Sequence, residues 1–133
     1  MDLIFLHGDC RAGLPLAGWL GDARRWPGTL RGRLWRAPAG GALLVLDDAA
    51  PLDIIGEIAR PATGTALAAL DAVLASACPG TARVSVEVVF QGRSGTAFAW
   101  ATPAAEARRR GAQRLDTADW AQLASRSPRR GPR

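Results

Sequence analysis

Residues 82–101 have the sequence ARVSVEVVFQGRSGTAFAWA, and this stretch does most to decide the fold class of the chain. Two apolar runs, ARVSVEVVF and GTAFAWA, flank the polar, glycine-containing segment QGRSG. Runs rich in β-branched and aromatic residues on either side of such a segment are typical of a β-hairpin. We therefore expect two antiparallel strands joined by a turn in the second half of the chain.

The remainder of the chain adds short strands and one clear helix. Strands are predicted over residues 3–6, 29–37, 42–46 and 52–59 from their apolar runs and alternation. An alanine-rich helix is predicted over 65–77, with leucines spaced along one face. Helices do not alternate with strands, which argues against a doubly wound parallel sheet. We expect an α+β fold: a small mixed, mostly antiparallel β-barrel or curved sheet with one main helix and a C-terminal helical tail.

The charge of the chain is concentrated in its last quarter. All 17 basic residues are Arg, and 9 of them balance 9 acidic residues over positions 1–105. From Glu106 onward, 8 Arg face three acids, so the whole net charge of +5 lies there. We expect a domain over residues 1–102 and an Arg-rich helical or disordered tail over 103–133. Such a tail is a candidate for binding an acidic protein or nucleic acid.

Composition also bounds the cellular setting. Two cysteines, Cys10 and Cys78, do not make a disulfide framework. The apolar run at the start is too short for a signal peptide, and the most apolar stretch, residues 65–78, carries Asp71. No stretch approaches the length of a membrane span. We expect a cytoplasmic protein with reduced thiols and no contact with membranes.

The segment FLHGDCRAG, residues 5–13, places polar groups and glycines directly after an apolar strand. A Walker phosphate loop is excluded because Leu-Pro follows the second glycine where Lys-Ser or Lys-Thr is needed. His7, Asp9 and Cys10 are residue types that bind metals or act as nucleophiles, but the chain has no other His and only one distant Cys. The alternative is a strand-terminating loop. We expect neither a metal nor a cofactor.

Several short motifs follow one another in a characteristic order along the chain. They are Gly8 and Arg11 in the opening loop, then Gly32, Leu34 and Trp35, then Gly56 and Glu57, then Leu70 and Asp71, then Arg83. Each motif is weak alone, but in this order they resemble the γ-glutamylcyclotransferase-like family over roughly residues 3–102. The resemblance implies that family's fold. It also implies a ligand-binding loop at His7, Gly8, Asp9, Cys10 and Arg11, and a pocket that includes Leu74 and Arg83.

The resemblance also implies a reaction, in which the α-amine of a γ-glutamyl substrate attacks its own γ-carbonyl. An amine and 5-oxoproline are released. The attacking nitrogen arrives as an ammonium, so a positioned group must accept its proton and return one to the leaving nitrogen. The position of the family's catalytic Glu is occupied by Leu74, and a later aromatic position by Thr81. Leu cannot transfer protons.

These substitutions predict a protein that keeps the fold and lacks the standard cyclotransferase activity. It would serve as a small-molecule-binding or regulatory module, with a small γ-glutamyl-type compound as its ligand. The alternative is an active cyclotransferase that uses a relocated acid–base group, for which Glu57 and His7 are the candidates, with Cys10 as a nucleophile. A third hypothesis is a nucleic-acid-associated protein that acts through the Arg-rich tail. Whether the protein is an enzyme stays open at this point.

Overall fold

The structure of the protein is a computed structural model, which describes residues 3–7, 24–60, 64–77 and 79–120. These residues form seven strands and two helices. In chain order they are β1 (Ile4–Leu6), β2 (Arg25–Arg36), β3 (Ala42–Val45), β4 (Leu52–Ala59), α1 (Gly64–Ala77), β5 (Ala82–Phe90), β6 (Arg93–Ala101), α2 (Ala104–Arg109) and β7 (Gln113–Arg114).

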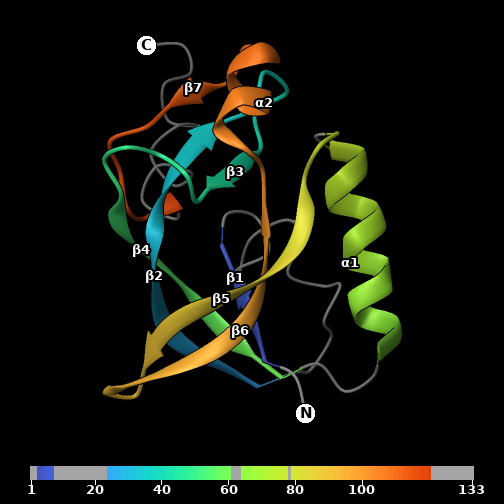
Figure 1. The fold of residues 1–133 in the computed structure, drawn as a ribbon. Coiled ribbons are helices and arrows are strands. Elements are labelled where there is room, and N and C mark those ends of the chain that lie inside the picture. Colours follow the sequence, from blue (N-terminus) through green and yellow to red (C-terminus); the bar gives the residue numbers. More distant parts are fainter. Residues whose placement is uncertain (1–2, 8–23, 61–63, 78, 121–133) are drawn as a thin grey trace, which may run out of the picture.

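Five of the strands close into a small barrel (Figure 1). Their order is β2, β4, β1, β6 and β5, and β5 returns to β2 through the pair of Thr29 with Val89. Within the barrel, β1 runs parallel to β6, and the other neighbours are antiparallel. The short strands β3 and β7 extend the sheet along the end of β2. The expectation of a small, mixed but mostly antiparallel barrel is confirmed.

The hairpin predicted from residues 82–101 is formed by β5 and β6, with Phe90 paired to Arg93. Only Gln91 and Gly92 lie in the turn, and both have positive φ, 52° and 76°. Positive φ at both central residues defines the tight type I′ turn that joins twisted antiparallel strands. The turn is therefore shorter than the polar segment QGRSG, whose last three residues belong to β6.

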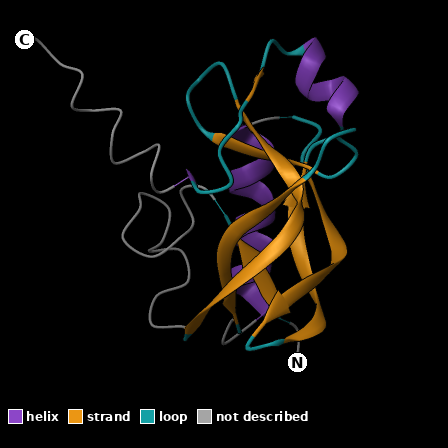
Figure 2. Ribbon diagram, turned by 90° about the vertical axis from the view of Figure 1, so that its left-hand side faces the viewer, coloured by secondary structure: helices purple, strands orange, loops and turns teal. Residues whose placement is uncertain are grey.

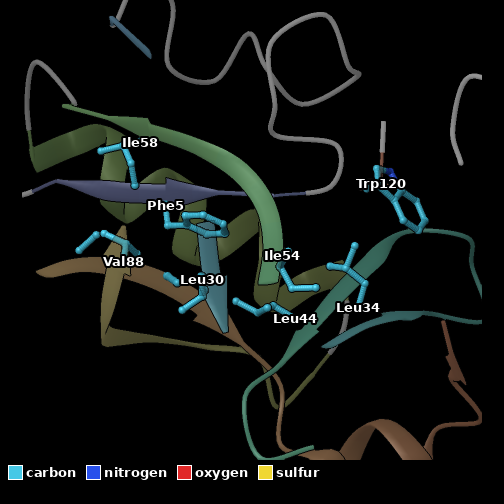
Figure 3. Close-up of a cluster of buried hydrophobic side chains, with 10 residues drawn as sticks. Phe5, Leu30, Leu34, Leu44, Ile54, Ile58, Val88 and Trp120 are labelled. Carbon is cyan, nitrogen blue, oxygen red and sulfur yellow. The ribbon is translucent and has the colours of Figure 1, made fainter. Parts of the chain in front are cut away.

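The barrel interior is filled by one apolar cluster, shown in Figure 3. Its buried members are Phe5, Leu30, Leu34, Leu44, Ile54, Ile58, Val88, Ala97, Ala99 and Trp120. The strands β1 and β4 approach each other closely beside this cluster. A Cβ atom at Gly56 would overlap both the Leu6 carbonyl oxygen and the Phe5 ring, so this position requires glycine.

The helix α1 lies outside the barrel along its length (Figures 1 and 2). Its three leucines, Leu67, Leu70 and Leu74, belong to a second apolar cluster. The barrel residues of that cluster are Ile4, Leu6, Ala59, Phe98 and Trp100. They come from β1, β4 and β6, so α1 covers the outer side of these strands. This burial of its leucine face is what holds the helix in place.

Residues 104–120, which belong to the predicted tail, pack on the barrel. The backbone N–H of Leu115 donates to the Leu34 carbonyl oxygen (3.0 Å), and that of Ile55 donates to the Ala118 carbonyl oxygen (2.8 Å). Trp120 is 5% exposed and belongs to the interior cluster, near Leu34 in Figure 3. Residues 121–133, with the sequence AQLASRSPRRGPR, lie outside the described residues. No described helix is long and apolar enough to cross a membrane.

A buried polar cluster around Asp48 joins β7 to the barrel. The Asp48 carboxylate accepts two hydrogen bonds from Arg114 (both 2.8 Å), one from Trp35 Nε1 (3.1 Å) and one from the Ala50 N–H (2.9 Å). Arg33 Nε lies 3.9 Å from the same carboxylate. The hydrogen bonds from Arg114 hold the pKa of Asp48 far below its ordinary value, despite its burial.

Candidate functional site

A small cavity of about 30 Å³ lies where β1 ends, between the barrel and the last turns of α1. Its lining comes from β3, α1, β6 and the segments that follow β1, precede β5 and follow β6. The lining residues are His7, Ala42, Leu43, Leu44, Leu74, Thr81, Trp100 and Thr102. A cavity of this volume holds one or two water molecules, so the described residues form a narrow, mostly apolar recess.

His7 is the only ionisable group among these lining residues. It directly follows β1, and its ring stacks on that of Phe5, with centroids 6.5 Å apart and planes inclined by 26°. Its Nε2 lies 3.4 Å from the Trp100 carbonyl oxygen. A carbonyl oxygen can only accept, so this long contact assigns a proton to Nε2. The imidazole is thereby oriented between the barrel core and β6.

Leu74 and Thr81, which the resemblance predicts at the positions of the family's catalytic Glu and of a later aromatic residue, line the same cavity as His7. Leu74 is half-buried and contributes an apolar wall. The Thr81 and Thr102 hydroxyls lie 2.7 Å apart and share a hydrogen bond. Thr102 is 1% exposed, and its backbone N–H donates to the Leu44 carbonyl oxygen (2.8 Å). The polar groups here are neutral hydroxyls and one imidazole.

Asp71 lies one turn before Leu74 on α1, and its carboxylate connects the helix to the β5–β6 hairpin. Its Oδ1 accepts a hydrogen bond from Trp100 Nε1 (2.7 Å), and its Oδ2 lies 3.5 Å from Arg83. The Arg83 guanidinium also lies over the Phe98 ring, 5.2 Å from its centroid. Both charged groups are therefore engaged outside the cavity, and Arg83, a predicted pocket residue, is not among the lining residues.

Glu57, the second candidate acid–base residue, lies on β4 opposite Leu6 of β1. Its Oε1 accepts a hydrogen bond from Arg25 at 3.1 Å, and both side chains are largely buried. Its neighbours Gly56 and Ile58 alternate with it and are buried, which puts Glu57 on the outer side of the strand. Of the two candidates, the structure brings only His7 to the cavity.

The rest of the predicted binding loop, Gly8, Asp9, Cys10 and Arg11, lies outside the described residues. Among the residues that are described, no group of three or more His, Cys, Asp or Glu side chains is arranged to hold a metal ion.

Asp71 and Trp100 were not identified as a connected pair from the sequence, because they are 29 positions apart and only the packing of α1 brings them together.

No protein-family model matches the chain, and no curated protein matches it by sequence. Solved structures do resemble it. YkqA from Bacillus subtilis superposes with a TM-score of 0.74 at 18% identity, over 98% of this chain and 44% of YkqA. The uncharacterized protein PH0828 from Pyrococcus horikoshii gives 0.68 at 16% identity, over 99% of this chain and 100% of PH0828. An AIG2-like protein from Mus musculus, also named GGACT, gives 0.61 at 22% identity, over 77% of each chain.

This chain therefore spans less than half the length of YkqA. The structural matches agree with the motif order found in the sequence, and the resemblance is confirmed at the level of the fold. The chain has the γ-glutamylcyclotransferase-like fold.

Proposed function

We propose that this chain uses its γ-glutamylcyclotransferase-like fold as a non-catalytic module that binds a small γ-glutamyl-type ligand. One observation carries the proposal: no carboxylate is among the described residues that line the cavity. Leu74 occupies the position that the family resemblance assigns to the catalytic acid. The protein would then bind its ligand against the recess beside β1, which by itself admits a group the size of one or two water molecules, and lack cyclotransferase turnover.

The engagement of the nearby acids supports this proposal. Cyclisation needs a group that removes a proton from the substrate ammonium, and such catalysis contributes about 10²–10⁴-fold in rate. Asp71 is held by Trp100 and Arg83, and Glu57 is held by Arg25. Moving either carboxylate to the reacting atoms would break these contacts.

A second candidate function is a cyclotransferase that uses His7 as its acid–base group. The observation in its favour is that His7 lines the cavity beside Leu74. An imidazole changes its charge near neutral pH and can both accept and return a proton. This candidate predicts turnover that disappears in His7→Gln.

The deciding experiment measures 5-oxoproline formation by the purified wild-type protein from γ-glutamyl amines and γ-glutamyl amino acids. The proposal predicts no turnover, together with saturable binding of a γ-glutamyl amide or 5-oxoproline in calorimetry. Binding without turnover supports the non-catalytic module. Turnover lost in His7→Gln would establish the second candidate instead. Absence of both binding and turnover would contradict each of the two.

Leu74→Glu tests whether a carboxylate at this position is the missing element. It places an acid at the cavity wall and should give weak turnover if the recess accepts the substrate. It should also lower the free energy of unfolding by about 1–3 kcal/mol, because the half-buried site offers no ready partner for the charge. Leu74→Gln is the matched control, since Gln has nearly the same shape as Glu and cannot ionise at neutral pH. Turnover in Leu74→Gln equal to that in Leu74→Glu would contradict the role of the charge.

A further inference from the structure

Among the described residues, β5 has a paired strand along only one of its edges for most of its length, and α1 contacts it through the ion pair of Asp71 with Arg83. All its residues, from Ala82 to Phe90, pair with β6. On its other edge the described strands supply a single pair, Val89 with Thr29 of β2. In Figure 1, β5 runs from this meeting point away from β2 toward the top of α1. Over residues 82–88, the described part of the chain supplies no second strand.

The turn geometry determines which backbone groups this edge presents. In a two-residue hairpin, the pair that flanks the turn, here Phe90 with Arg93, exchanges two hydrogen bonds. Hydrogen-bonded pairs then recur at every second residue, so the even-numbered residues of β5 bond with β6. Arg83, Ser85 and Glu87 therefore direct their N–H and C=O groups to the open edge. Val89, the next odd-numbered residue, is where β2 pairs.

We propose that this edge is a homodimer interface, at which β5 pairs antiparallel with β5 of a second copy of the chain. Three residues, Arg83, Ser85 and Glu87, direct backbone groups to the open edge, so a symmetric pairing of two copies is centred on the middle one, Ser85. Each Arg83 then lies directly opposite Glu87 of the other copy, and this occurs twice across the two-fold axis. Directly opposed unlike charges stabilise an antiparallel pair, and like charges destabilise it.

No neighbouring register matches the charges as well. If the register is shifted by two residues, Arg83 lies opposite Ser85 or Val89 of the other copy. The two charges of each edge then have no opposite charge across from them. An odd shift sets presenting residues against residues whose backbone groups already bond with β6. The register centred on Ser85 is therefore the one that satisfies both the backbone groups and the side-chain charges.

The side chains along the edge are available for this pairing. Arg83, Ser85 and Glu87 are exposed, and Glu87 makes no ion pair with any described residue. Arg83 already contacts Asp71 at 3.5 Å, but its guanidinium has five N–H donors and can bridge two carboxylates. An uncovered strand edge is a template for pairing with another chain.

The test uses charge reversal and sedimentation or light scattering over micromolar to sub-millimolar concentrations. Wild-type protein should form a dimer. Glu87→Arg sets Arg against Arg twice, and Arg83→Glu sets Glu against Glu twice, so each alone should raise the dimer dissociation constant by about tenfold or more. An equimolar mixture of the two variants should form a heterodimer, because every opposed pair is then unlike. Arg93→Glu, on the same hairpin but on β6, is the matched control and should leave the dimer unchanged.

The mixing experiment separates the interface from effects on folding. A variant that simply unfolds would not recover in the mixture, and circular dichroism of each variant checks its fold independently. A wild-type protein that stays monomeric over this concentration range overturns the proposal. A dimer that tolerates Glu87→Arg, or single variants that fail to recover on mixing although folded, would also overturn it.

Discussion

Asp48→Asn is the substitution for which the structure predicts the clearest loss of stability. The Asp48 side chain is 3% exposed and accepts hydrogen bonds from Arg114, Trp35 and the Ala50 N–H. Beside it lies the buried guanidinium of Arg33, 7% exposed, whose other groups donate to the carbonyl oxygens of Leu115 (2.9 Å) and Ala50 (2.7 Å). Asn removes the negative charge beside the buried Arg33 cation, which keeps the two carbonyl oxygens and, at 3.4 Å from its Nη1, the exposed carboxylate of Asp116.

The expected cost follows from these partners. Breaking a buried ion pair by removing one charge costs about 3–5 kcal/mol. Arg114 is 42% exposed and regains water when it is released, so we expect the lower end, about 3 kcal/mol. Asp53→Asn is the matched control, with the same change in net charge. The ion pair of Asp53 with Arg31 has side chains 69% and 65% exposed, and its loss should cost less than about 0.5 kcal/mol.

Urea unfolding at several pH values provides the assay. Because folding lowers the pKa of Asp48, its contribution to stability is complete above the ordinary pKa of about 4 and is lost as the pH falls below it. The wild type should therefore lose more stability between pH 6 and pH 2 than Asp48→Asn does, so the two unfolding free energies converge in acid. Equal stability of both proteins at pH 7, or parallel pH profiles, would refute the role assigned to this carboxylate.

Three further predictions concern the contact between β1 and β4 at Gly56, the buried side chain of Trp120 and the Arg-rich tail. Gly56→Ala should lower the free energy of unfolding by about 2–3 kcal/mol, because its Cβ meets a carbonyl oxygen that cannot move aside, whereas Gly41→Ala, with open space around it, should have little effect in the same urea titration. Trp120→Ala should cost about 3–5 kcal/mol and lower the Tm, since it empties one end of the interior cluster; a change below about 1 kcal/mol would contradict its place in the core. Deletion of residues 125–133 should leave the Tm unchanged and remove most salt-sensitive binding to DNA or RNA in fluorescence anisotropy; equal binding by the shortened chain would assign the site to the barrel.

The strands and the helix were predictable where their side-chain pattern is local. The period-2 pattern of residues 82–101 and the leucine spacing in 65–77 are fixed by which face each element buries. The start of β2 was not predictable in this way. The strand begins at Arg25, four residues earlier than expected, and passes through Pro27 and Gly28 because it pairs with β4 along that length. Pairing with a distant strand overrides the weak β propensity of this Pro-Gly sequence.

The motif order identified some of the residues that line the cavity, but it did not identify Arg83 as lying outside it or the contacts around it. The motif order brought His7, Leu74 and Thr81 into consideration, and all three line one cavity. Their spacing in the sequence could not reveal that Asp71 is bound to Trp100, or that Glu57 is bound to Arg25. Such contacts depend on how α1 and β2 are placed against the barrel. For the same reason, β7 escaped prediction: it is a two-residue strand defined only by its pairing with β2.

The position of β1 in the barrel has a consequence for how the protein folds during synthesis. This three-residue strand is made before the other strands, yet it lies between β4 and β6, with Phe5 opposite Ile58 and Ile4 opposite Phe98. The β4 partner is synthesised within the first 59 residues, but the β6 partner is complete only at residue 101. The barrel therefore cannot close strand by strand as the chain emerges. Until the β5–β6 hairpin is complete, the apolar side chains of the earlier strands stay exposed to solvent, where they can bind chaperones or aggregate.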